Sequence, residues 1–146
     1  MIRFSSTRKP SVAQLQDLYQ FAWWTQGRRN ADVAKLLKHP QVFLTAWEGK
    51  LLVGFARVLT DFTYRAIIAD VIVRPGTTGQ GIGSALVQKA VKDRRLKSVT
   101  GFWLYTTDKQ AFYEKLGFSF SPQHLMILRT GKGPQPPKPA ARPSKR

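Results

Sequence analysis

The chain has 146 residues, of which 42% are hydrophobic and 12% aromatic, and this size and composition suit one folded domain and exclude a wholly disordered chain. It contains no cysteine, which excludes disulfides, thiolate metal sites and cysteine nucleophiles. Its 24 Lys and Arg against 8 Asp and Glu give a net charge of +16, which favours anionic partners such as nucleic acid or a polyphosphate cofactor.

The first part of the chain predicts a strand followed by two helices. Residues 2–5 are the candidate strand. Ser11 and Gln14 have the spacing of a capping box, so a helix is expected to start at Ser11 and to end at Trp23-Trp24. Its apolar face would consist of Leu15, Leu18, Tyr19 and Ala22. Asn30 is expected to cap a second, shorter helix that stops before the proline at position 40.

The middle of the chain predicts three strands. Residues 42–47 and 51–59 flank a Glu-Gly-Lys turn and read as a hairpin. Residues 65–74 form the next strand, which is apolar almost throughout, as expected of a strand that is covered on both faces. Only Asp70 interrupts its apolar run from 66 to 73.

Further elements follow a glycine-rich loop. A helix is expected from residue 82 to about residue 95, then a strand over 99–105 and a short helix over 108–116 that ends at a glycine. Residues 118–120 and 125–129 read as last short strands. The alternation predicts a mixed α/β or α+β domain with a central sheet.

Residues 131–146 differ from the rest of the chain. They contain five of the nine prolines, five basic residues and no acid, so they are interpreted as a flexible basic tail. No apolar run approaches the roughly 18 residues of a membrane span, and the N-terminal sequence lacks the apolar stretch of a signal peptide. We therefore expect a cytoplasmic protein without a membrane span.

The loop between the apolar strand and the next helix holds the strongest chemical signal. Gly79, Gly81 and Gly83 let the backbone turn sharply and let an anion approach the unpaired N–H groups of the first helical turn. Together with the helix dipole, this makes a phosphate cradle. The missing Gly-Lys pair weakens the interpretation as a P-loop, and Ser84, which stands where a dinucleotide loop needs glycine, weakens that interpretation too. A glycine-rich turn without a ligand is the remaining alternative.

Two segments carry a resemblance to a known family. DVIVRPGTTGQGIGSALV (70–87) resembles the acetyl-CoA loop of the GNAT superfamily of N-acetyltransferases, and AFYEKLGF (111–118) resembles that family's later helix and strand. WTQGRR (24–29) and residues 42–61 are similar to its cyanobacterial and plastid branch, which includes aralkylamine (serotonin) and protein N-acetyltransferases. The resemblance implies a GNAT-type mixed, largely antiparallel central sheet flanked by helices in residues 1–130, and acetyl-CoA as co-substrate without a metal. We also expect the sheet to splay near Asp70, so that acetyl-CoA enters the gap.

The resemblance also implies the residues that bind the cofactor. These are Val71, Ile72, Val73, Thr78, Gly79, Gln80, Gly81, Ile82, Gly83, Ser84, Asp108 and Phe112. The backbone N–H of Val71 or Ile72 would bind the thioester oxygen. Thr78 departs from the Gln or Arg usual in the family, and binding is expected to survive because backbone amides hold the pyrophosphate.

Two residues are catalytic candidates. Asp70 is the only acid in its apolar strand, so desolvation could raise its pKa toward that of a useful general base. Alternatively it is structural and pairs with Arg57 or Arg65. Tyr113 matches the family's general acid, which protonates the departing thiolate. Its alternative role is helix packing.

The acceptor is expected to be a primary amine, either an arylalkylamine or a protein N-terminus or lysine. Trp24, Phe62 and Tyr64 are candidate contacts for it. The competing hypothesis is a basic nucleic-acid-binding module, and the tail could also give the enzyme a weak contact with RNA or an acidic surface. The two histidines are isolated and have no metal-ligand spacing. The protein is expected to be a monomer or a homodimer.

Overall fold

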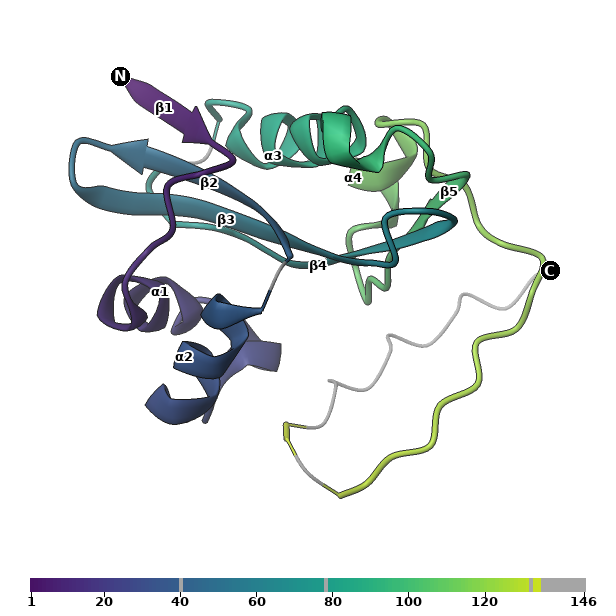
Figure 1. Ribbon diagram of the computed structural model, residues 1–146, viewed down its shortest axis with the longest axis horizontal. Helices are drawn as coiled ribbons and strands as arrows, with labels where there is room; N and C mark the ends of the chain where they lie inside the picture. Colours follow the sequence, from purple (N-terminus) through teal and green to yellow (C-terminus); the bar gives the residue numbers. More distant parts are fainter. Residues whose placement is uncertain (40, 78, 132, 135–146) are drawn as a thin grey trace, which may run out of the picture.

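The described part of the chain folds into one five-stranded sheet with helices on both faces (Figure 1). The computed structural model describes residues 1–39, 41–77, 79–131 and 133–134. The strands lie in the order β1-β2-β3-β4-β5. Helices α3 and α4 lie on one side of the sheet and α1 and α2 on the other. This is the mixed, largely antiparallel sheet flanked by helices that the sequence predicts.

The elements follow the predicted order, with shorter helices than expected. In chain order they are β1 (Ile2–Ser5), α1 (Val12–Tyr19), the 3₁₀ turn η1 (Trp23–Thr25), α2 (Asn30–Lys38), β2 (Val42–Glu48), β3 (Leu51–Thr60), β4 (Arg65–Val73), α3 (Ile82–Val91), the 3₁₀ turn η2 (Arg94–Leu96), β5 (Gly101–Trp103) and α4 (Gln110–Glu114). No helix among them is long and apolar enough to cross a membrane.

The capping box at the start of α1 is confirmed. The Gln14 N–H donates to the Ser11 hydroxyl at 3.1 Å, and the Ser11 N–H donates to the Gln14 side-chain oxygen at 2.9 Å. The predicted end of α1 is wrong, because Trp23 belongs to a separate 3₁₀ turn. Asn30 is the first residue of α2 and not its cap. Arg29 occupies the cap position, and its side chain makes no capping hydrogen bond to the helix backbone. Asp32 in the first turn complements the helix dipole instead.

The sheet opens between β4 and β5. Strands β1 to β4 pair in antiparallel fashion, whereas β4 and β5 are parallel. This parallel pairing covers only Arg65–Ile67 of β4 and Gly101–Trp103 of β5. The second half of β4, which contains Asp70, is therefore not paired with β5. The two strands separate near Asp70, where the sheet was predicted to splay.

The sheet has a hydrophobic core on each face. On the α3 face the core joins Val42, Val53 and Ile68 to Ile82 and Leu86. On the α1 face a second cluster joins α1 and α2 to inward-facing aromatic and aliphatic side chains of β2, β3 and β4. Both faces of β4 are thus covered by helices, which explains its nearly continuous apolar sequence.

Gly54 of β3 sets how closely α3 approaches the sheet. A methyl group at this position would lie 2.9 Å from Ile82 Cγ2, 3.0 Å from Leu86 Cδ1 and 3.2 Å from the Ala46 Cβ atom. All three neighbours are buried and cannot move away easily. The absence of a side chain at Gly54 therefore fixes the first turn of α3 against the sheet.

We expect Gly54→Ala to lower the free energy of unfolding by about 1–3 kcal/mol, because overpacking forces buried side chains out of their rotamers. Urea unfolding followed by circular dichroism measures this loss. Gln88→Ala, on the exposed face of α3, is the control and should leave the midpoint almost unchanged. Equal midpoints for the wild type and Gly54→Ala would contradict the close packing.

The two short strands predicted after α4 are absent from the described part of the chain. Residues 118–120 and 125–129 have no ladder partner there, and the chain after Phe120 runs away from the sheet (Figure 1, yellow-green segment). Leu125, Met126, Ile127 and Leu128 are exposed. The apolar pattern predicts strands, but a strand also needs an adjacent edge that offers hydrogen bonds. Most of the predicted tail, residues 135–146 with 132, lies outside the described residues.

Candidate active site

The N-terminus of α3 exposes backbone donors at the end of β4. Gly81 is the N-cap residue, so the N–H groups of Ile82, Gly83 and Ser84 belong to the first helical turn and have no intrahelical acceptor. No side chain of the described residues caps this end of the helix. The amides and the helix dipole together favour an anion at this position.

The backbone angles of this loop strongly favour glycine. Gly79 has φ 87° and Gly81 has φ 66°, in the left-handed region that other residues rarely adopt. Apart from its chain neighbours, a methyl group built on either glycine would meet no atom of the described residues within 4 Å. The Cα atoms of both glycines therefore face open space in the described structure. Gln80 is exposed, and Thr78 lies outside the described residues.

Helix α4 packs against the same end of α3. A methyl group at Gly83 would lie 3.4 Å from Phe112 Cζ and 3.5 Å from Val73 Cγ2. The start of α3, the end of β4 and α4 therefore meet at one place. Asp108 is exposed in the turn before α4. Residues from both motifs identified in the sequence lie together here.

Tyr113 follows Phe112 and is half-buried in an aromatic group. Its ring packs edge-on against Phe112 at 4.9 Å and against Phe118 at 5.8 Å between centroids. Gly117 has φ 95°, and the Phe118 N–H donates to the Tyr113 carbonyl at 3.1 Å, which closes the end of the helix. Burial raises the pKa of the Tyr113 hydroxyl, so the group keeps its proton at neutral pH.

Strand β4 contains a bulge at its centre. Arg57 pairs with Ala69 and Phe55 pairs with Ile72, so Asp70 and Val71 together oppose the single residue Ala56 of β3. Asp70 has φ 53°, an unusual value for a residue with a side chain. Bulges bend a strand and redirect its groups, here at the residues expected to face the thioester.

The side chain of Asp70 is buried and forms ion pairs with two arginines. Arg28 donates from Nη1 to Oδ2 at 2.7 Å and from Nη2 to Oδ1 at 3.2 Å. Arg57 donates from Nε to Oδ2 at 2.7 Å, and the Tyr19 hydroxyl donates to the same oxygen at 3.3 Å. The structural alternative for Asp70 predicts an ion pair with Arg57 or Arg65, and among the described residues Asp70 pairs with Arg57 and not with Arg65.

The expected rise in the pKa of Asp70 is wrong. Desolvation by burial does raise this pKa, but hydrogen bonds and charge attraction from Arg28 and Arg57 outweigh it, so the pKa of the carboxyl lies below its usual value of 3.8. The sequence could not show this balance because Arg28 lies 42 residues away in the chain. Asp70 is therefore ionised at neutral pH and only weakly basic.

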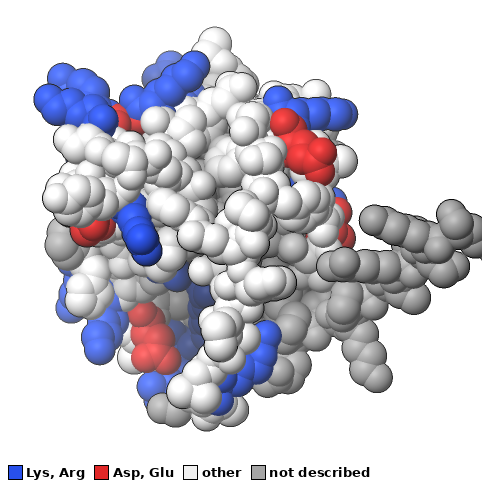
Figure 2. Space-filling view, turned by 90° about the vertical axis from the view of Figure 1, so that its right-hand side faces the viewer, with Lys and Arg blue, Asp and Glu red and all other residues white. Residues whose placement is uncertain are grey.

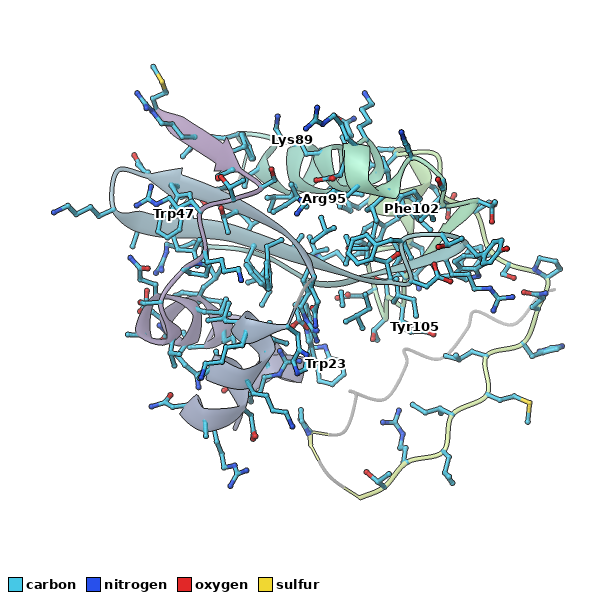
Figure 3. The ribbon with its side chains drawn as sticks, viewed as in Figure 1. Trp23, Trp47, Lys89, Arg95, Phe102 and Tyr105 are labelled. Atoms are coloured by element: carbon cyan, nitrogen blue, oxygen red, sulfur yellow. The ribbon has the colours of Figure 1, made fainter. Side chains whose placement is uncertain are left out.

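The three candidate acceptor contacts do not gather at one place. Trp24 packs on the α1 face of the sheet, edge-on to Trp23 at 5.8 Å between ring centroids, and Figure 3 shows Trp23 on that side. Phe62 and Tyr64 are exposed in the β3–β4 turn. Strand residues from Tyr64 to Asp70 span roughly 20 Å. Only Trp24 is thus near the α1-face residues that hold Asp70.

A family model for the acetyltransferase (GNAT) family matches residues 5–118 of this chain. The chain belongs to the GNAT family. It is 31% identical over 136 residues to a histone acetyltransferase of Glycine max, and it covers 58% of that protein with 85% of its own length. It thus spans little more than half of this relative.

Two further similarities agree with the family. A chloroplastic serotonin N-acetyltransferase of Oryza sativa subsp. japonica is 38% identical over 74 residues, which are 50% of this chain and 37% of the relative. The crystal structure of a GNAT-family protein from Xanthomonas campestris has a TM-score of 0.79 at 25% identity and covers 89% of this chain and 94% of its own. The predicted family, its plastid-type relatives and the fold are confirmed.

Sequence reasoning missed Tyr19 and Arg28 as residues of the site. From the sequence, Tyr19 is assigned only to the apolar face of a helix. Arg28 is included only within the WTQGRR segment that carries the family resemblance. A signal that could have pointed to a basic partner for Asp70, although not to Tyr19 or to the resulting pKa, is the cost of burying an unpaired charge. A buried Asp in an apolar strand needs cationic partners, and the basic pair Arg28-Arg29 follows two tryptophans.

Proposed function

We propose that this protein is an acetyl-CoA-dependent N-acetyltransferase that acts on a primary amine. The observation that carries the proposal is the open first turn of α3, with its uncapped amides after the end of β4, the strand that contains the bulge. These backbone donors fit a pyrophosphate, because the open space over Gly79 and Gly81 lets the anion reach them. Acetyl-CoA, when bound, would supply an acetyl thioester, whose C–S bond breaks as the C–N bond forms.

The chain's own groups would hold the substrates and move two protons. The backbone N–H of Val71, in the bulge, or of Ile72, directly after it, would bind the thioester oxygen. Tyr113 would donate its proton to the departing sulfur, because burial keeps the phenol protonated at neutral pH. Asp70 stays the candidate acceptor of the amine proton, although its two ion pairs weaken it as a base.

The cofactor site is tested with a matched pair of glycine variants. Gly81→Trp should weaken acetyl-CoA binding at least about tenfold, which is about 1.4 kcal/mol, because the side chain covers the amides at the start of α3. Gly49→Trp is the control, since Gly49 also has positive φ (59°) and open space but lies in the remote β2–β3 turn. Isothermal titration calorimetry gives both dissociation constants. No acetyl-CoA binding by the wild type, or equal loss in both variants, would refute the proposal.

The nucleic-acid alternative depends on the basic surface of the protein and on the basic tail, and most of the tail is outside the described residues. Figure 2 shows Lys and Arg spread around the face that it displays rather than gathered in one patch. The named relatives are acetyltransferases, which favours the enzyme over the nucleic-acid alternative.

The location and the acceptor of the protein are still predictions. The rice relative is chloroplastic, so a cytoplasmic location stays a prediction. The choice between an arylalkylamine and a protein amine, and between monomer and homodimer, also stays a prediction.

A further inference from the structure

The buried ionic group at Asp70 has an excess of positive charge. Arg28 and Arg57 face the single carboxylate of Asp70, and we call these three residues the two-arginine cluster. The Asp70 side chain is 4% exposed, that of Arg57 13% and that of Arg28 28%. Burial raises the pKa of the adjacent Tyr19 hydroxyl, which therefore stays neutral. The cluster thus has a net charge of +1 in a largely buried place.

Nothing in the described part of the chain balances this charge. Neither arginine forms an ion pair there with a carboxylate other than Asp70, and the second partner of Arg57 is the neutral Gln41 side chain, at 3.3 Å. Each guanidinium has five N–H groups. Two of those on Arg28 and two of those on Arg57 have acceptors. A buried charge that lacks a counterion is costly, so an anion is favoured here.

The position of the cluster connects it to the acceptor. Asp70 begins the bulge, and the next residues, Val71 and Ile72, are those proposed to face the thioester. Arg28 enters from the loop between η1 and α2, lies over the Tyr19 ring at 4.9 Å from its centroid, and is the more exposed of the two arginines. A group bound to Arg28 would therefore lie beside an amine that reaches the bulge.

We propose that the two-arginine cluster binds a carboxylate that the acceptor carries close to its amine, so that the substrate class is an amino acid or a peptide with an acidic start. This inference rests on the proposed function and names its substrate. Planar guanidinium groups match carboxylates in geometry and in charge. The same excess charge disfavours the ammonium form of the acceptor and favours the neutral amine that attacks the thioester.

Tryptophan and tryptamine test the proposal because they differ only by the carboxylate next to the amine. The expected kcat/KM of the full chain is higher for tryptophan than for tryptamine, and Arg28→Gln should reduce this ratio at least about tenfold. Arg28→Lys, which keeps the charge without the planar fork, should reduce it less. Arg29→Gln is the matched control, since the adjacent Arg29 is exposed and pairs with Asp32. Its ratio should equal that of the wild type.

Two further comparisons distinguish the source of the carboxylate and separate binding from turnover. Peptides that begin with Asp or with Asn show whether an acidic side chain replaces the α-carboxylate. Calorimetry with N-acetyltryptophan and N-acetyltryptamine measures the carboxylate preference without any reaction, and Arg28→Gln should abolish it. Acetylation of tryptamine with no carboxylate preference in kinetics or binding would overturn this inference and leave the proposed function intact. If the wild-type protein did not bind acetyl-CoA, the proposed function would be refuted instead.

Discussion

Replacing Tyr113 with Phe is expected to lower kcat by about 10²- to 10⁴-fold, the usual contribution of a positioned proton donor. The variant keeps the aromatic ring that packs against Phe112 and Phe118, so the fold and the KM for acetyl-CoA should change little. Single-turnover and steady-state measurements with a saturating amine separate these quantities. Tyr105→Phe is the control because Tyr105 is exposed and lies outside α4.

The pH profile gives a second test of the same residue. Burial raises the pKa of the Tyr113 hydroxyl above its ordinary value of 10.0, so the alkaline decline of kcat that depends on this proton should lie above pH 10. In Tyr113→Phe this decline should disappear together with most of the rate. A variant with near-normal kcat would mean that Tyr113 only packs the end of α4, which is the alternative that the sequence leaves open.

Replacing Asp70 with Ala is expected to lower the free energy of unfolding by about 3–5 kcal/mol, because it leaves the guanidinium groups of Arg28 and Arg57 partly buried without a counterion. Urea unfolding at pH 7 measures the loss. Asp32→Ala is the control, since Asp32 forms an exposed ion pair with Arg29 and should contribute little. Similar unfolding midpoints for the two variants would show that the ion pairs of Asp70 do not stabilise the fold.

Acid unfolding follows from the same pairs. The pKa of Asp70 is lower in the folded protein than its usual 3.8, so its stabilisation is complete above about pH 3.8 and is lost as the pH falls through the folded pKa. Asp70→Asn should therefore be less stable than the wild type at pH 7, with a smaller decline in stability below about pH 3.8. The kcat of Asp70→Asn at a pH where the variant is folded tests the separate role as a base. A large loss of kcat with an intact fold would support that role.

Local sequence determines the parts of the site that depend on backbone conformation. The positive φ angles of Gly79, Gly81 and Gly117 need residues without a side chain, so the loop before α3 and the end of α4 could be read directly from their glycines. The capping box at Ser11 is equally local. Strands β2, β3 and β4 have long apolar runs, and the order of the five strands along the chain was predicted correctly.

Tertiary contacts determine the protonation of Asp70 and whether the predicted C-terminal strands form. The pKa of Asp70 depends on Arg28 and Arg57, which only the folded chain brings within hydrogen-bond distance, and attraction to these charges exceeds the effect of burial. The bulge likewise needs the register between β3 and β4. Residues 125–129 have an apolar pattern but no adjacent strand edge in the described part of the chain, so they form no strand there. Propensity and periodicity act within a few residues, whereas ion pairs and sheet pairing act between segments that are distant in sequence.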